Sequence, residues 1–257
     1  EIRTDRDNLI FRAISRVFQE VGVPEPEIQI ESWQEVPLSR GLGSSACAII
    51  GSMVAANALL DRVIPEQRLL QLAIEMEGHP DQVAAALLGG LCISVLDGDV
   101  PQVAKIQVPD DLQCVVFVPD FKMDTKLARS VLTPHVERED AVFNIGRASL
   151  LVAGLATGHH EYLRLATQDR LHQPARAQVF PPMKQLFRGA LKAGALGVFL
   201  SGAGSSVVAL TRKSERRAMT LGYEMADAAD KSGLPGRFLI LEPAAHGAEV
   251  VSFKGTG

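Results

Sequence analysis

The segment from Pro37 to Leu60 constrains the fold of this 257-residue chain more than any other part of the sequence. It begins with a short loop that holds Gly41 and Gly43, and it continues as a run of small and aliphatic residues from Ser44 to Leu60. A helix that is apolar on all sides is stable only inside a core. The segment therefore predicts a buried helix whose amino end carries a glycine loop.

The residues before this segment predict one helix and one strand. Apolar residues recur every three or four positions from Asn8 to Val21, which is typical of an amphipathic helix. The partly alternating residues from Glu27 to Val36 favour a strand that leads into the loop. After the buried helix we expect helices from Pro65 to Gly78 and from His79 to Leu88, then strands at 91–95 and 102–108.

The turn-forming residues Pro109, Asp110 and Asp111 predict a domain boundary, with one domain at 1–109 and a second at 110–257. In the second domain we expect strands at 112–118, 198–200, 207–211, 237–242 and 249–253, and helices at 126–132, 138–157, 161–169, 183–193 and 215–232. Because helices and strands mix without strict alternation, the fold class is predicted to be α+β.

Composition excludes several classes of protein. Hydrophobic residues make up 47% and charged residues 22%, which excludes a disordered chain. The net charge of −4, without a basic run that contains aromatics, argues against a nucleic-acid partner. No apolar run suits a membrane span or an export signal, and Cys47, Cys92 and Cys114 form no disulfide or zinc pattern. We expect a soluble, cytoplasmic protein with no membrane partner.

The glycine loop is suited to binding an anion. Its glycines let backbone amides approach a ligand without obstruction by a Cβ atom. Ser44 and Ser45 stand at the helix start, where N–H groups and the helix dipole favour phosphate, and their hydroxyls can also reach Mg²⁺. Plain helix capping after a tight turn is the alternative interpretation.

Two well-known phosphate loops do not fit this segment. A Walker A loop needs a lysine after its last glycine, and no lysine follows Gly43. Gly41, Gly43 and Ala46 match a Rossmann fingerprint, with Asp61 twenty residues after the first glycine. A Rossmann unit requires a second strand before that acid, whereas Ala46 to Leu60 is one helical segment.

The loop at 37–47 instead resembles the phosphate loop of the GHMP kinases, a superfamily that includes galactokinase, homoserine kinase and mevalonate kinase. The segment Glu-Met-Glu-Gly-His-Pro-Asp-Gln at 75–82 resembles a homoserine kinase motif, and 201–206 resembles the C-terminal glycine motif of the superfamily. Residues 123–129 and 170–176 also resemble homoserine kinases. The resemblance implies a domain like ribosomal protein S5 followed by a ferredoxin-like α/β-plait domain.

The resemblance also implies an activity, namely ATP-dependent phosphorylation of the side-chain hydroxyl of L-homoserine on the route to threonine, with ATP and Mg²⁺ as cofactors. It assigns Ser44 and Glu75 to the metal, although Glu77 competes because residues two apart on a helix cannot face the same way. Either glutamate can instead be a solvated helix residue. The implied triphosphate contacts are Pro37, Leu38, Ser39, Arg40, Gly41, Leu42, Gly43, Ser44, Ser45, Ala46 and Cys47.

Substrate contacts follow from the same resemblance. It implies that Asp81 and Gln82 act in catalysis beside Ser44 and Glu75, with Asp81 as a positioning group. It further implies that Arg129 and Arg176 bind the substrate carboxylate as planar forks. The implied substrate-binding residues are His79, Asp81, Gln82, Thr125, Arg129, Arg176, Gly202 and Gly204. As alternatives, the histidine can be structural, the arginines can be surface residues, and the segment at 201–206 can be a hairpin turn.

This sequence departs from the homoserine kinase pattern at three places. Gln82 replaces an asparagine, and Ser205 replaces a proline, which predicts a looser loop. The third departure concerns the start of the chain. The family begins with a strand and a Pro-Ala-Ser/Thr-x-Asn-Leu-Gly-like motif, and neither occurs from Glu1 onward. We therefore expect either a natural region before Glu1 or a less complete substrate pocket. Two alternative functions stay open. One is another GHMP small-molecule kinase of mevalonate or isoprenoid type, and the other is a catalytically silent nucleotide sensor. A homodimer also stays open as the assembly.

Overall fold

The computed structural model describes residues 5–252, whose contacts divide the chain into two units. The first unit holds the residues up to Val36, the stretch Gly43–Gln107 and the residues from Ala244 onward. The second unit holds Pro37–Leu42 and Val108–Pro243. The chain therefore changes unit inside the glycine loop, between Leu42 and Gly43, and again beside the boundary expected after Pro109.

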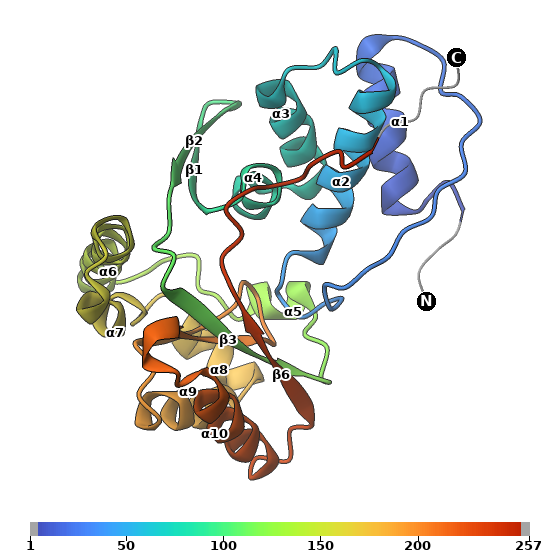
Figure 1. The fold of residues 1–257 in the computed structure, drawn as a ribbon. Coiled ribbons are helices and arrows are strands. Elements are labelled where there is room, and N and C mark those ends of the chain that lie inside the picture. Colours follow the sequence, from blue (N-terminus) through green and yellow to red (C-terminus); the bar gives the residue numbers. More distant parts are fainter. Residues whose placement is uncertain (1–4, 253–257) are drawn as a thin grey trace. The chain divides into compact units, whose positions relative to one another are not determined.

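The first unit is built mainly from helices (Figure 1). They are α1 (Leu9–Val21), α2 (Ser44–Leu59), α3 (Glu66–Glu77) and α4 (Pro80–Leu88), followed by an antiparallel hairpin of β1 (Leu91–Asp97) and β2 (Val100–Ile106). Helix α2 packs against α1, α3 and α4, and its residues Ile49, Ile50 and Met53 are almost completely buried. The buried helix predicted from the small and aliphatic run is confirmed.

The prediction of a strand from Glu27 to Val36 is wrong. The segment is extended, and Ile28 and Ile30 pack against the core, so the alternation correctly identified its inner face. A strand also needs a hydrogen-bonding neighbour. No strand within residues 5–252 pairs with this segment, and alternation alone cannot supply a partner.

The second unit contains a four-stranded antiparallel sheet in the order β4 (Gly197–Leu200), β5 (Val207–Arg212), β3 (Leu112–Pro119), β6 (Gly236–Leu241). Helices α9 (Met183–Lys192) and α10 (Ala218–Asp230) pack against each other and against this sheet. In chain order these elements form a β-α-β-β-α-β unit, which is the ferredoxin-like arrangement. The expected α+β fold class is confirmed.

The remaining helices of this unit lie between β3 and α9. They are α5 (Thr125–Ser130), α6 (Arg138–Thr157), α7 (Leu163–Ala166) and the short α8 (Gln173–Val179), with a 3₁₀ turn at His160–Tyr162. Another 3₁₀ turn, at Lys213–Glu215, lies between β5 and α10. Helix α8 was not expected from the sequence, because its seven residues are too few to show a period.

Two expected helix boundaries and one expected strand need correction. The helix expected at 161–169 ends at Ala166, and the helix expected from Glu215 begins at Ala218, because Arg216 adopts a left-handed backbone with φ of 54°. No strand forms at 249–252, and Phe253 lies outside the described residues.

The structure also bears on two expectations from composition, one about membrane spans and one about the cysteines. Among residues 5–252, no helix combines the length and apolarity needed to cross a membrane. Cys47, Cys92 and Cys114 are free thiols. Burial raises the pKa of Cys114 to about 11, so this thiol is uncharged at neutral pH.

Candidate active site

The first half of the glycine loop is anchored within the second unit by the side chain of Arg40. Its guanidinium donates to the carbonyls of Leu38 (2.7 Å), Pro119 (2.9 Å) and Asp120 (2.7 Å). These bonds use Nε, Nη1 and Nη2. Arg40 was expected among the triphosphate contacts. Its side chain instead stabilises the conformation of the loop.

A second anchor joins this half of the loop to the C-terminal glycine motif. Ser201 Oγ donates to the Gly41 carbonyl at 2.8 Å, and the Ser206 amide donates to the Arg40 carbonyl at 3.1 Å. A Cβ atom on Gly41 would lie 2.1 Å from the Ser201 carbonyl oxygen, so only glycine permits this approach. The two glycine motifs of the sequence thus meet within one unit.

The motif at 201–206 is firmly held as well. Ser205 is fully buried, and its hydroxyl donates to the Phe121 carbonyl at 2.6 Å. This hydrogen bond supplies a restraint at the position where the missing proline predicts a looser loop.

The second half of the loop opens the long helix α2 in the first unit. Gly43 is the N-cap with φ of 75° and has no side chain to cap the helix, and the first intrahelical bond runs from the Cys47 amide to the Gly43 carbonyl. The amides of Ser44, Ser45 and Ala46 come before the first amide that donates within the helix, so they have no acceptor inside α2. The first turn of α2 holds no acidic residue. Such a helix start attracts a phosphate group through its N–H donors and its dipole.

One carboxylate reaches this helix start, and it belongs to Glu77. The Ser45 hydroxyl donates to Glu77 Oε1 at 2.6 Å. Glu75 is occupied elsewhere, since it forms ion pairs with Arg16 (2.9 Å) and Arg68 (3.3 Å). The described contacts therefore pair Ser45 with Glu77 and do not bring Ser44 and Glu75 together.

The donor set at Ser45 and Glu77 fits Mg²⁺. A hydroxyl and a carboxylate are hard oxygen ligands, and Mg²⁺ keeps several waters or substrate oxygens beside one or two protein groups. Within residues 5–252, no group of three or more His, Cys, Asp or Glu side chains is arranged to hold a metal ion. A site completed by phosphate oxygens and water agrees with both observations.

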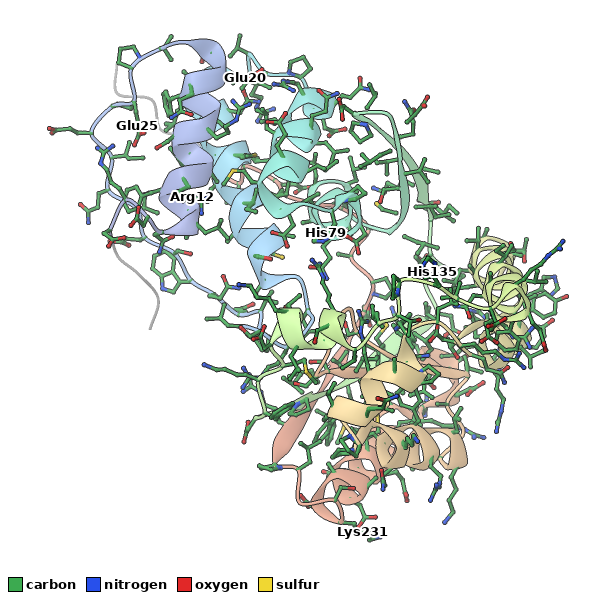
Figure 2. The ribbon with its side chains drawn as sticks, turned by 180° about the vertical axis from the view of Figure 1, so that it is seen from behind. Arg12, Glu20, Glu25, His79, His135 and Lys231 are labelled. Atoms are coloured by element: carbon green, nitrogen blue, oxygen red, sulfur yellow. The ribbon has the colours of Figure 1, made fainter. Side chains whose placement is uncertain are left out.

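The expected substrate residues of the first unit follow one another at the start of α4. His79 is the extended N-cap of that helix (Figure 2), Pro80 is its first residue, and Asp81 lies in its first turn. A Cβ atom placed on Gly43 would lie 3.6 Å from Gln82 Oε1, so the Gln82 amide lies beside the glycine loop. Gln82 and Glu77 therefore border the same helix start.

In the second unit, Arg176 of α8 lies at the C-terminal glycine motif. Its Nη1 donates to the Gly202 carbonyl at 2.8 Å, and its Nε donates to the Ala128 carbonyl at 3.3 Å. Burial lowers the pKa of Arg176, Asp169 opposes this effect, and the positive charge of Arg129 lowers the pKa further. The structure thus brings Arg176, Arg129 and Gly202 together and leaves Arg176 Nη2 without an acceptor among the described contacts.

Thr125 and Gly204 complete the expected set in this unit. Thr125 is the first residue of α5, one helical turn before Arg129, so the two side chains lie on one face. Gly204 has φ of 94° and lies in the loop after Gly202. A carboxylate or phosphate near both guanidiniums would be attracted by their positive charges.

Comparisons with known proteins identify the family of this chain. Residues 8–90 match the GHMP kinases N terminal domain, and residues 149–222 match the GHMP kinases C terminal domain. The chain is 42% identical to a homoserine kinase of Caldicellulosiruptor bescii over 99% of this chain and 83% of that protein. It is 39% identical to a homoserine kinase of Carboxydothermus hydrogenoformans over 100% of this chain and 83% of the relative.

One solved structure shows the same likeness in three dimensions. The crystal structure of homoserine kinase from Cytophaga hutchinsonii matches this chain with a TM-score of 0.88 and 31% identity. The match covers 96% of this chain and 80% of that one. The likeness therefore extends through both units.

The ion-pair network that holds Glu75 predicts a pH dependence of stability. Glu20 of α1 (Figure 2) accepts hydrogen bonds from Arg68 and Arg16, which hold its pKa at about 2. Because the folded-state pKa lies below the unfolded value of about 4.3, the stabilisation is complete above that value and is lost as the pH falls toward 2. We expect Glu20→Gln to lower the unfolding free energy at pH 7 by at most about 1 kcal/mol, and the difference to disappear near pH 2.

Urea denaturation at pH 7, 5 and 3 checks this expectation, with Glu31→Gln as an exposed control. If the stabilities of Glu20→Gln and the wild type differed by the same amount at all three pH values, the folded-state pKa of Glu20 would not be depressed.

Proposed function

The chain belongs to the homoserine kinase family of the GHMP kinases, and we propose that it transfers the γ-phosphoryl group of ATP to the side-chain hydroxyl of L-homoserine. The observation that carries the substrate assignment is the position of Arg176 at the Gly202 carbonyl, with Arg129 near enough to lower its pKa. An amino acid substrate supplies a carboxylate, which a planar guanidinium binds well.

We place the ATP phosphates at the amino end of α2. The amides of Ser44, Ser45 and Ala46 donate to phosphate oxygens there, and Gly43 keeps the approach free of a side chain. We assign Mg²⁺ to Ser45 and Glu77, and we leave Ser44 as a phosphate contact and Glu75 as a structural group. When bound, Mg²⁺ neutralises charge on the phosphate oxygens.

We assign the amino acid to the substrate residues that the family resemblance implies. Arg176 Nη2 and Arg129 bind the α-carboxylate, and Thr125 adds a hydroxyl contact. His79, Asp81 and Gln82 orient the hydroxyl end, with Asp81 acting as a positioning group. Phosphoryl transfer depends mainly on such alignment and on charge neutralisation, so the proposed chemistry needs no strong general base.

The same proposal describes a cytoplasmic enzyme whose product feeds threonine synthesis. It includes no nucleic-acid or membrane partner, and it takes a homodimer as the assembly. The net charge of −4 supports the absence of a nucleic-acid partner, and family membership supports the place in threonine synthesis. The alternatives of a mevalonate-type kinase and of a silent nucleotide sensor predict different outcomes in a turnover assay.

A coupled assay of ADP release tests the activity directly. With Mg²⁺ and ATP, we expect turnover with L-homoserine and none with mevalonate, galactose or shikimate. Turnover with only a non-amino-acid substrate would favour another GHMP kinase. Calorimetric ATP binding without any turnover would favour the sensor.

The two neighbouring glutamates provide a matched pair of variants for the metal assignment. We expect Glu77→Gln to lower kcat by about 100-fold or more and to raise the Mg²⁺ concentration needed for half-maximal rate, because a metal ligand is lost. Glu75→Gln should change kcat by less than about threefold, since it loses only exposed ion pairs. Steady-state kinetics across a Mg²⁺ titration measure both effects, and the reverse order of the two variants would return the metal to Glu75.

Arg176→Lys tests the carboxylate assignment. One planar guanidinium bonds Gly202, Ala128 and the substrate at once, which an ammonium cannot do. We expect the KM for homoserine to rise about 10- to 150-fold, the equivalent of about 1.5 to 3 kcal/mol, with little change in the KM for ATP.

The control for this variant is an amino alcohol that lacks the carboxylate. Its reaction should be nearly as fast with Arg176→Lys as with the wild type, because it never made the contact. Equal losses for both substrates would indicate that Arg176 has a structural role.

A further inference from the structure

A polar cluster behind Arg176 sets the orientation of its guanidinium. His172 precedes α8, and its Nδ1 lies 3.3 Å from Arg176 Nη1. Arginine has donors only, so the imidazole must accept in this contact and Nδ1 carries no proton. The second hydrogen of Nη1 goes to the Gly202 carbonyl. Both hydrogens of Nη1 are therefore used by the protein, which leaves Nη2 for a ligand.

The imidazole is itself held by a buried carboxylate. The side chain of Asp169 is 6% exposed, and one of its oxygens lies 3.6 Å from His172 Nε2. Asp169 also accepts hydrogen bonds from the Asn144 amide (2.7 Å) and from the backbone amides of His172 (2.9 Å) and Gln173 (2.6 Å). These bonds outweigh burial and keep the pKa of Asp169 below its usual value, so the carboxylate is charged. It favours the tautomer with the proton on Nε2.

We propose that His172 is a positioning residue for Arg176, and that its neutral imidazole, oriented by Asp169, turns Nη2 of the guanidinium toward the substrate carboxylate. This inference rests on the proposed function, in which Arg176 binds that carboxylate. In this proposal His172 acts through Arg176 and is assigned no contact with ATP or with the reacting atoms.

The charges around His172 make this positioning sensitive to pH. Asp169 and Arg176 face the ring, Arg147 of α6 lines the same small pocket, and Arg129 lies beyond Arg176. Burial and Arg176 lower the pKa of His172 against the opposing effect of Asp169. A protonated imidazole cannot accept from Arg176 and adds a second positive charge beside it. Homoserine binding should therefore weaken as the pH falls through the pKa of His172.

Three variants of the full chain test the proposal. His172→Asn keeps an acceptor near the position of Nδ1 and does not titrate, whereas His172→Phe removes the acceptor. His159→Phe is the control, because it removes a histidine that pairs with Glu161 on the surface of the same unit. The KM for homoserine, the KM for ATP and kcat are measured from pH 7.5 to 5.5.

The expected pattern separates positioning from a general loss of structure. The KM of the wild type and of His159→Phe for homoserine should rise about fivefold or more on acidification, while His172→Asn changes less than about twofold. His172→Phe should have a KM about tenfold above the wild type at pH 7.5 with no further rise, while kcat and the KM for ATP stay within about twofold.

A second measurement uses the reciprocity of linked equilibria. If protonation of His172 weakens homoserine binding, then homoserine must lower the pKa of His172. A proton NMR titration, with the His172 signal assigned from its loss in His172→Asn, should show a lower pKa with homoserine than without it.

The outcomes distinguish this inference from the proposed function. No turnover of homoserine by the wild type at pH 7.5 would overturn the proposed function and, with it, this inference. Normal turnover with the same pH dependence of KM in the wild type and His172→Asn, or a pKa of His172 that rises or stays constant with homoserine, would overturn the positioning role alone.

Discussion

The glycine loop is held by different contacts in its two halves, and the proposed phosphate site depends on these contacts. On one side, Arg40 and Ser201 tie residues 38–41 to carbonyls and to the second glycine motif of the second unit. On the other side, the loop becomes the start of α2, whose buried residues hold it in the core of the first unit. Free amides can present a rigid cradle to phosphate only when the backbone that carries them is restrained in this way.

Charge is distributed differently over the two groups of ionisable residues. Around Glu75, two arginines and two glutamates balance each other, so this network has no need of a ligand. Around Arg176, Asp169 is an opposing negative charge and Arg129 is a neighbouring positive charge. In our proposal the substrate carboxylate binds at these arginines, and the glutamate network keeps a structural role.

The sequence was sufficient for the elements that carry their own signal. Period and composition predicted α1 and α2, and ordered motifs predicted the family and both glycine loops. The choice between Glu75 and Glu77 could not be made this way, because it depends on which side of α3 meets Arg16 and Arg68, and that is a property of packing. The segment from Glu27 to Val36 shows the same limit, since alternation gave its inner face but could not provide a neighbouring strand.

The comparison of Arg40 with Arg176 shows why residue type alone does not identify a binding group. Both arginines stand in or beside a glycine motif, and both donate to backbone carbonyls. Arg40 uses one hydrogen of each of Nε, Nη1 and Nη2 on three carbonyls. Arg176 uses Nε and both hydrogens of Nη1, so among the described contacts both hydrogens of Nη2 remain together on one nitrogen. In our proposal the substrate carboxylate binds at that nitrogen, and His172 helps to determine which nitrogen it is.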